Sequence, residues 1–261
     1  MTIVPIGAHV AGDNPLETAQ ALGIKQIQIF LGDPQSWKSS VFPGDMSAEA
    51  FKQAGQAAGI DVYVHARYVI NVATTNNKVR IPSRKLLQTD VDAAAAIGAR
   101  GVIVHGGHVT AEDDPAVGYE NWNKALTQLD MKVPVFIENT AGGKHSMARR
   151  LESIKYLWDA VGDLGPGFCL DTCHAHAGGI DMSDLADTIL GITGRIDLIH
   201  CNDSRDVFDS GADRHANLGN GSIDIDNIIN CIKTAKAPVI LETPTDGVAS
   251  DLELLSQALS K

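Results

Sequence analysis

Short apolar runs of strand length, each ending in a residue that can bind a metal ion, recur along the whole chain. Parallel α/β folds place their active sites at the carboxyl ends of the strands. Histidines and carboxylates that repeatedly close such runs therefore predict one shared metal site at that edge of a sheet. The runs are VYVH to His65, VIVH to His105, VPVFIE to Glu138, GFCLD to Asp171, DLIH to His200 and VILE to Glu242.

Segments of strand length alternate with segments of helical periodicity from end to end. Eight such pairs without a linker or a break in composition predict a (β/α)8 TIM barrel that forms a single domain over residues 1–261. An open doubly wound sheet is the alternative, but it needs a glycine-rich phosphate loop after the first strand, and the sequence has none. The expected strands lie near 4–9, 26–30, 61–65, 101–105, 133–138, 167–172, 196–201 and 238–242. The expected helices lie near 14–22, 47–58, 83–97, 119–129, 146–160, 183–192, 224–234 and 248–259.

Composition excludes several classes of protein. No apolar stretch approaches the roughly 18 residues of a membrane span, and the N-terminus lacks the basic and apolar regions of a signal peptide. The four cysteines form no CxxC pair, which favours reduced thiols. These features predict a cytoplasmic protein without a membrane partner, and the lack of an exposed apolar stripe favours a monomer.

The formal net charge of −11 argues at first against a nucleic-acid ligand. Three bound divalent ions would add six positive charges and bring −11 to −5. At the site itself, six positive charges would face four carboxylates, so the acidic total does not exclude a phosphate substrate. These carboxylates are Glu138, Asp171, Asp213 and Glu242.

Two short segments carry the densest groups of candidate ligands. CLDTCHAH (169–176) places Asp171 at a strand end and His174 on the following turn, and Asp213 and His215 lie on one polar loop. Carboxylates and neutral imidazoles suit zinc or manganese. A lone histidine or acid is more often hydrogen-bonded or solvated, but nine on one face would be costly to desolvate without a metal. Three neighbours are predicted to have no ligand role: Cys173, Cys201 and His176.

Motifs spread over nearly the whole chain resemble those of bacterial endonuclease IV, the AP endonuclease family 2 of the xylose-isomerase-like TIM barrels. They occur in the order of that family. The motifs are GAHV (7–10), YVINVA (68–73), IENTAGG (137–143), CLDTCHAHAGG (169–179), HCNDSRD (200–206), DRHANLGNG (213–221) and LET (241–243).

The resemblance implies three zinc ions per chain, with manganese possible at one site. Glu138 would bridge the first and the second ion. The implied ligands are His65, His105 and Glu138 for the first ion, Glu138, Asp171, His200 and Glu242 for the second, and His174, Asp213 and His215 for the third.

The resemblance also implies a metal-dependent hydrolase of the deoxyribonuclease IV (phage-T4-induced) type. The enzyme would cleave double-stranded DNA on the 5′ side of apurinic or apyrimidinic sites in base excision repair, leaving a 3′-hydroxyl and a 5′-deoxyribose phosphate. Removal of blocking groups from 3′ ends is an expected second activity. Glu242, which would orient the attacking water, and the bridging Glu138 are the expected catalytic residues.

The expected DNA contacts lie on loops beside the metal site. Tyr68 matches a tyrosine that enters the DNA stack in the family. Gln35 stands where the family has an arginine, so a guanidinium charge is missing there. The full set of expected contacts is Tyr68, Gln35, Arg67, Arg205 and Arg214.

Two other functions fit the same fold. A sugar isomerase or epimerase would use a two-metal site, and a non-catalytic binding barrel would be expected to lack a ligand. His174, Asp213 and His215 favour a third metal over the first alternative, and the complete ligand set argues against the second.

Overall fold

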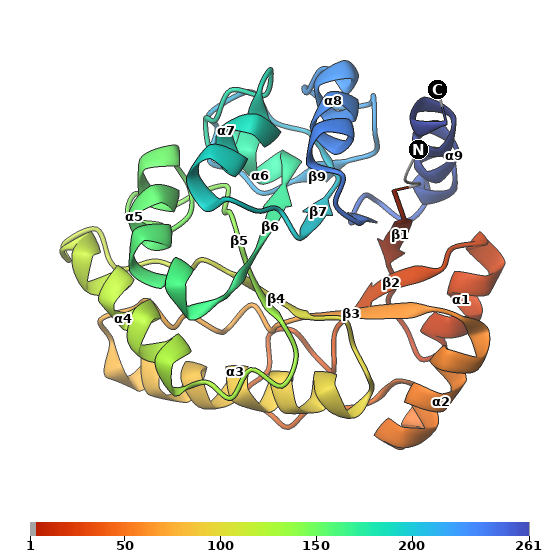
Figure 1. Ribbon diagram of the computed structural model, residues 1–261, viewed down its shortest axis with the longest axis horizontal. Coiled ribbons are helices and arrows are strands. Elements are labelled where there is room, and N and C mark those ends of the chain that lie inside the picture. The colour runs from red at the N-terminus through yellow and green to blue at the C-terminus, as the bar shows by residue number, and fades with distance from the viewer. Residues whose placement is uncertain (1–3, 261) are drawn as a thin grey trace.

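The computed structural model describes residues 4–260 and contains a closed barrel of eight parallel strands (Figure 1). Neighbouring strands follow each other around the barrel in chain order, and the last strand pairs with the first. The predicted TIM barrel is therefore confirmed. The barrel strands are β1 (Ile6–His9), β2 (Gln26–Ile29), β3 (Asp61–His65), β4 (Val102–His105), β5 (Val135–Glu138), β6 (Gly167–Asp171), β7 (Leu198–His200) and β10 (Val239–Leu241).

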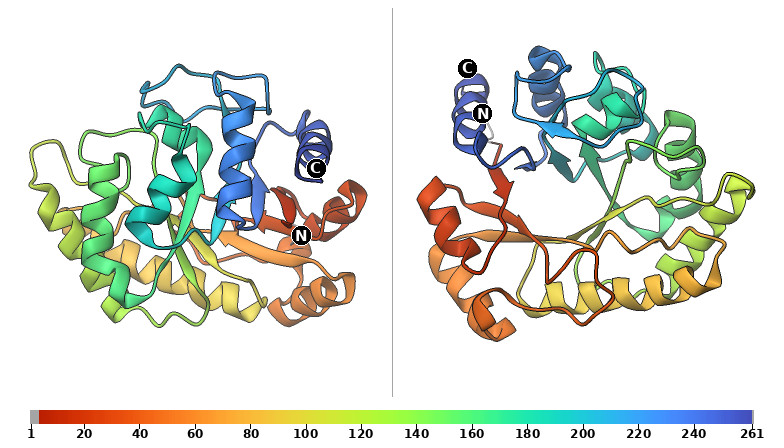
Figure 2. Two further views of the ribbon diagram at one scale, coloured as in Figure 1. Left: turned by 45° about the horizontal axis from the view of Figure 1, so that its top comes forward. Right: turned by 180° about the vertical axis from the view of Figure 1, so that it is seen from behind.

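Helices surround the barrel in all three views (Figures 1 and 2). Within residues 4–260, every helix is too short or too polar to span a bilayer. The helices on the outside are α1 (Pro15–Leu22), α2 (Ala48–Ala58), α3 (Asn77–Ala96), α4 (Pro115–Gln128), α5 (Leu151–Val161), α7 (Leu185–Thr193), α8 (Ile225–Ala235) and α9 (Val248–Leu259). The short elements are η1 (Pro43–Asp45), η2 (Gly162–Leu164), α6 (Thr172–Ala177) and the antiparallel pair β8 (Asp203–Ser204) and β9 (His215–Ala216).

Three helix starts differ from the expected ones by more than two residues. Helix α3 begins six residues before the expected residue 83, because Asn76 caps the Lys78 amide at 3.0 Å and the helix continues through Pro82. Helix α4 begins at Pro115, four residues early, after the Asp114 cap. Helix α5 begins five residues late, because residues 146–148 form backbone hydrogen bonds with the loop after β4 and with the residues after β5.

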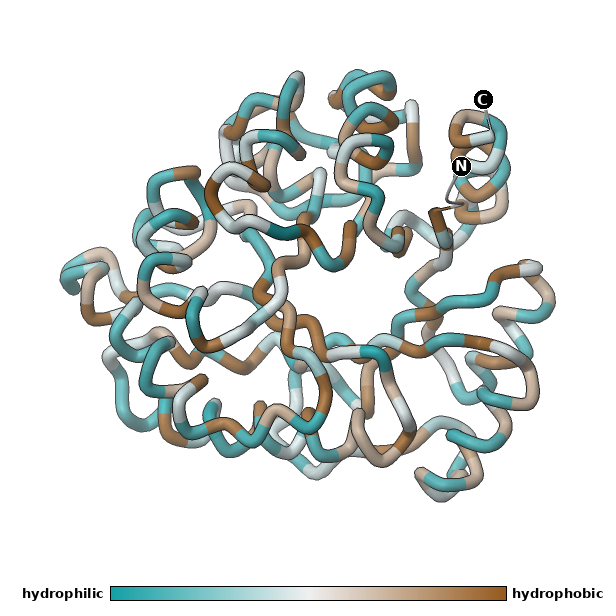
Figure 3. Tube along the Cα trace, viewed as in Figure 1, coloured by the Kyte–Doolittle hydropathy of each residue, from teal (hydrophilic) through white to brown (hydrophobic). Residues whose placement is uncertain are grey.

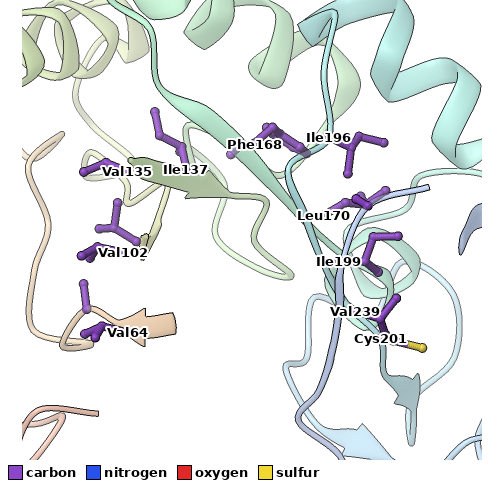
Figure 4. Packing of buried hydrophobic residues seen from close by; sticks show 14 of the residues in the cluster. Val64, Val102, Val135, Ile137, Phe168, Leu170, Ile196, Ile199, Cys201 and Val239 are labelled. Atoms are coloured by element: carbon purple, nitrogen blue, oxygen red, sulfur yellow. The ribbon is translucent and has the colours of Figure 1, made fainter. Parts of the chain in front are cut away.

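Side chains alternate along each strand between the inside of the barrel and the surrounding helices. Hydrophobic stretches follow the central strands, whereas hydrophilic residues recur on the outer turns of the helices (Figure 3). The outward-facing residues form the large core beneath the helices, and part of it is drawn in Figure 4. Cys201 belongs to this outer core and therefore faces away from the barrel interior. The inner core consists of Tyr63, Ile103, Phe136, Cys169, Leu198 and Ile240.

Candidate metal centre

Each inner-core residue is followed, two positions later, by a predicted metal ligand. Because residues two apart share a face of a strand, these ligands form the next layer inside the barrel, at the carboxyl ends of the strands. The six pairs are Tyr63 and His65, Ile103 and His105, Phe136 and Glu138, Cys169 and Asp171, Leu198 and His200, and Ile240 and Glu242.

The nine predicted ligands gather into three groups that match the expected sets. Within each group, one ligand atom from every residue lies within 4.8 Å of all the others. A fourth group contains Cys173 with Asp171 and His215. Burial raises the pKa of the Cys173 thiol to about 12, which disfavours a thiolate ligand. The three matching groups are His65, His105 and Glu138; Glu138, Asp171, His200 and Glu242; and His174, Asp213 and His215.

Glu138 is shared by two of these groups and is fully buried. Its Oε2 lies 3.3 Å from Nε2 of both His65 and His105. Its Oε1 lies 3.0 Å from Nδ1 of His200, so the two oxygens face different groups. One carboxylate can therefore join two metal ions at this position.

The third group depends on the loop that contains β9. Asp203 accepts backbone hydrogen bonds from Gly219, Gly221 and Ile223, and these fix the returning part of the loop. The Asp213 Oδ1 then lies 3.1 Å from the His174 Nε2 and 3.2 Å from the His215 Nε2. Both nitrogens are buried, and neither contact has the geometry of a hydrogen bond, so the three side chains converge as ligands of one metal ion would.

Carbonyl oxygens orient four of the histidines. A ring nitrogen of His65 lies 2.6 Å from the Ala66 carbonyl oxygen, and the equivalent distance from His174 to Asn139 is 2.9 Å. Such a bond places the proton on that nitrogen and leaves the other nitrogen free to bind a metal. The same arrangement pairs His200 with the side-chain carbonyl of Gln28 at 2.7 Å and His215 with the Glu242 backbone carbonyl at 3.2 Å.

The imidazoles and carboxylates of the site shift one another's pKa values. Burial acts to raise the pKa of Glu138, but His200 and His105 outweigh it and hold that pKa well below its usual range. Burial acts to lower the pKa of His215, but Asp213 and Asp171 raise it to about 9. Divalent ions can replace these imidazolium protons among the carboxylates, so the donor set fits them.

Gln28 is a site residue that the sequence analysis missed. It is fully buried, and its amide nitrogen lies 2.6 Å from Glu242 Oε1 and 3.1 Å from His9 Nδ1. Burial lowers the pKa of His9 to about 4, so this imidazole is neutral and can accept the second bond. The signal was present in QIQI (26–29), where two glutamines alternate with isoleucines in a fully buried strand.

A cleft of about 700 Å³ opens over the ligands. It contains the half-exposed Tyr68 and the exposed Arg205, two of the predicted DNA contacts, beside His105, Asp213, His215 and Glu242. Gln35 is exposed on the loop after β2, and Arg214 forms an ion pair with Asp206. Tyr68 and Arg205 therefore remain the best placed of the predicted contacts.

The prediction that Arg67 contacts DNA is wrong, because its guanidinium is buried. The Arg67 side chain is only 3% exposed and lies 2.7 Å from the equally buried Asp90. It also donates to the backbone carbonyl of Lys38 and, at 2.9 Å, to the hydroxyl of Ser40. Arg67, on the loop after β3, thereby joins the loop after β2 to α3.

Arg67→Leu should lower the free energy of unfolding by about 3–5 kcal/mol, because it leaves Asp90 buried and unpaired. The deficit should shrink as the pH falls, since burial raises the pKa of Asp90 and the carboxyl takes up a proton. Urea unfolding measures both effects. The matched control is the double variant Arg67→Leu/Asp90→Leu, which should lose much less stability; an equal loss in both variants would contradict the role of the ion pair.

The chain is similar to known proteins over almost its whole length. The family described as "Xylose isomerase-like TIM barrel" matches residues 16–260. A protein of Mycobacterium marinum named "Probable endonuclease 4" is 53% identical over 255 residues, which are 98% of this chain and 99% of that protein. The corresponding protein of Mycobacterium tuberculosis is 54% identical over 252 residues, or 97% and 98% of the two chains.

Solved structures of related proteins have the same fold. Endonuclease IV from Thermus thermophilus has a TM-score of 0.81 and 29% identity, and the match covers 98% of this chain and 99% of that one. A D-tagatose 3-epimerase-like protein has a TM-score of 0.80 at only 16% identity, over 98% and 97% of the two chains, so it shows the shared fold alone. The resemblance inferred from the motifs is thereby confirmed: this chain belongs to the endonuclease IV family, within the xylose isomerase-like TIM barrels.

Proposed function

We propose that this protein is a DNA-repair endonuclease that hydrolyses the phosphodiester bond on the 5′ side of an abasic site, with three divalent metal ions. The products are a 3′-hydroxyl and a 5′-deoxyribose phosphate. The same hydrolysis at a blocked 3′ end would release a phosphate or phosphodiester remnant. Zinc fits the mixed imidazole and carboxylate ligands, and manganese is an alternative at one site.

The observation that carries the proposal is the third ligand group beside a bridging carboxylate. Glu138 faces two groups, and His174 lies near both Glu138 Oε1, at 3.2 Å, and Asp213 Oδ1, at 3.1 Å. The three groups are therefore contiguous. A two-metal sugar isomerase has no need of the third group, whereas phosphodiester hydrolysis must neutralise charge on the attacking, leaving and non-bridging oxygens.

The chain's own residues supply positions around the reacting phosphate. Bound divalent ions would lower the pKa of water towards about 7 and neutralise phosphate charge. Glu242 would orient the attacking water, because its Oε1 is held by Gln28 while its Oε2 faces His200 at 3.3 Å. Tyr68, which lines the same cleft, would contact the DNA beside the abasic nucleotide.

The substrate in this proposal is double-stranded DNA. Extruding an abasic nucleotide costs little, because no base has to be unpaired. Such an enzyme would act as a monomer in the cytoplasm, as one domain over residues 1–261.

A duplex with a single tetrahydrofuran abasic analogue tests the proposal. Protein loaded with zinc should cut on the 5′ side of the analogue and leave a 3′-hydroxyl. The analogue cannot undergo β-elimination, so such a cut must be hydrolysis. Chelation should abolish cleavage, and added zinc should restore it, because the proposed hydrolysis depends on the bound ions.

Two outcomes would contradict the proposal. One is an intact duplex when bound metal has been confirmed by elemental analysis, and a sugar substrate for the barrel would then be the next hypothesis. The other is cleavage that persists after complete removal of the metal. An undamaged duplex of the same sequence is the control for non-specific nicking.

A further inference from the structure

Cations without acidic partners are concentrated on the first half of α3. Elsewhere in residues 4–260, many exposed arginines and lysines form ion pairs, as Arg100 does with Asp61 and Lys155 with Asp159, and the unpaired ones are scattered along the chain. Four cations within residues 78–85 form none with any residue of 4–260. Such a cluster on a chain of net charge −11 favours an anionic partner. The four cations are Lys78, Arg80, Arg84 and Lys85.

Two of these lysines share a groove with the exposed Trp37. The groove has a volume of about 540 Å³ between α3 and the loop after β2, which passes alongside α3 (Figure 2). Its α3 residues recur at helical spacing and therefore lie on one face of the helix. The indole of Trp37 is 47% exposed. The groove is lined by Trp37, Lys78, Pro82, Lys85, Leu86 and Thr89.

This groove and the cleft over the metal ligands have no lining residue in common, but they lie at the same end of the barrel. Helix α3 follows the loop that leaves the carboxyl end of β3, so its first half lies on the side of the metal centre. Tyr68 lines the cleft, and its amide donates to the Pro34 carbonyl at 2.9 Å. Pro34 precedes Trp37 on the same loop, so the loop that lines the groove is in contact with the loop that lines the cleft.

We propose that this groove binds the phosphodiester backbone of duplex DNA beside the abasic site. Lys78 and Lys85 neutralise phosphates, and the indole of Trp37 packs against the sugar edge. DNA is the occupant favoured by the charge and by the connection to the metal cleft. The inference depends on the proposed DNA substrate, but it concerns residues that contact neither the metal ions nor the abasic nucleotide.

A salt titration of DNA binding tests the groove. For an undamaged duplex, the slope of log Kd against log salt should fall by about 1.8 in the double variant Lys78→Gln/Lys85→Gln, because each phosphate contact contributes about 0.9. On the tetrahydrofuran duplex, KM should rise while kcat stays within about twofold of the wild type, since both lysines lie outside the metal centre. Quenching of Trp37 by iodide should also decrease when undamaged duplex binds, with Trp37→Phe as the blank.

The matched control removes the same charge elsewhere. In Lys124→Gln/Lys233→Gln both lysines lie in the later halves of α4 and α8, away from the carboxyl ends of the strands. The control should retain the wild-type slope. If Lys78→Gln/Lys85→Gln keeps the wild-type salt slope, as it would if the groove binds an acidic protein instead of DNA, the inference is wrong. It is also wrong if the control variant loses as much of the slope as the α3 variant does. If the wild type still cleaves the analogue in either case, the proposed function stands.

Discussion

Glu138→Gln should lose the metal ions of the two groups that Glu138 joins, and cleavage should fall by at least ~10³-fold. The amide keeps the size of the side chain, but it cannot supply two anionic oxygens to two ions. Removing several kcal/mol of metal-based stabilisation from the transition state corresponds to this rate loss, since about 1.4 kcal/mol is tenfold. Elemental analysis of the purified variant measures the metal loss independently of activity.

The control for this variant is Glu120→Gln, the same substitution on the exposed face of α4. It should keep all metals and full cleavage. Circular dichroism should show a folded barrel in both variants, because the outer core does not include Glu138. Three tightly bound metals in Glu138→Gln, or cleavage at the wild-type rate, would eliminate the bridging role.

The layer of metal ligands could be predicted from the sequence because two general rules point to the same residues. Alternation along a strand and the carboxyl-end rule of barrels both depend on backbone geometry alone. They therefore place His65 and Glu138 together without knowledge of any contact. Asp213 and His215 lie on a loop; their spacing made them candidate ligands, but only the family motif assigned them to the third ion. The structure supplies the physical reason, namely the buried Asp203 that fixes the loop.

Arg67 shows where the same reasoning fails. It follows the ligand His65 by two residues and precedes Tyr68, so an exposed position near DNA was a reasonable expectation. The direction of its side chain depends on Asp90, which lies 23 residues later in α3. No periodicity relates two such positions, because a single long-range ion pair determines the orientation. The start of α3 has a similar cause, since the Asn76 cap outweighs the interruption expected from Pro82.

The barrel itself does not distinguish a nuclease from an epimerase. A D-tagatose 3-epimerase-like protein matches this chain with a TM-score of 0.80, close to the 0.81 of an endonuclease IV. Function therefore has to be argued from side chains. The feature that favours a nuclease over an epimerase is the group of His174, Asp213 and His215. It is a third ligand group beside the two groups that Glu138 joins.

Gln28→Leu should lower the affinity of the group that contains His200 and Glu242 for its metal ion by about 10–100-fold. This is the usual effect of losing a residue that orients metal ligands. The Gln28 carbonyl receives the His200 Nε2 proton at 2.7 Å, which leaves Nδ1 for the metal. Its amide holds Glu242 Oε1 at 2.6 Å and leaves Oε2 free. If the Gln28 amide were flipped, its oxygen would face the Glu242 carboxylate and repel it. Only the observed orientation therefore satisfies His9, His200 and Glu242 together. Leucine removes both constraints at similar volume.

Gln26→Leu provides a matched control on the same strand. Gln26 is also buried and faces the barrel interior, but its amide donates to the backbone carbonyls of Pro5 and Val239, at 3.0 and 2.6 Å. Competition with a chromophoric chelator should show weakened zinc binding only in Gln28→Leu, and cleavage by that variant should recover as zinc is raised. Equal weakening in both variants would mean that the loss of a buried amide perturbs the barrel generally. Weakening in Gln28→Leu alone makes Gln28 a positioning residue, through which β2 controls the metal centre although it contributes no ligand.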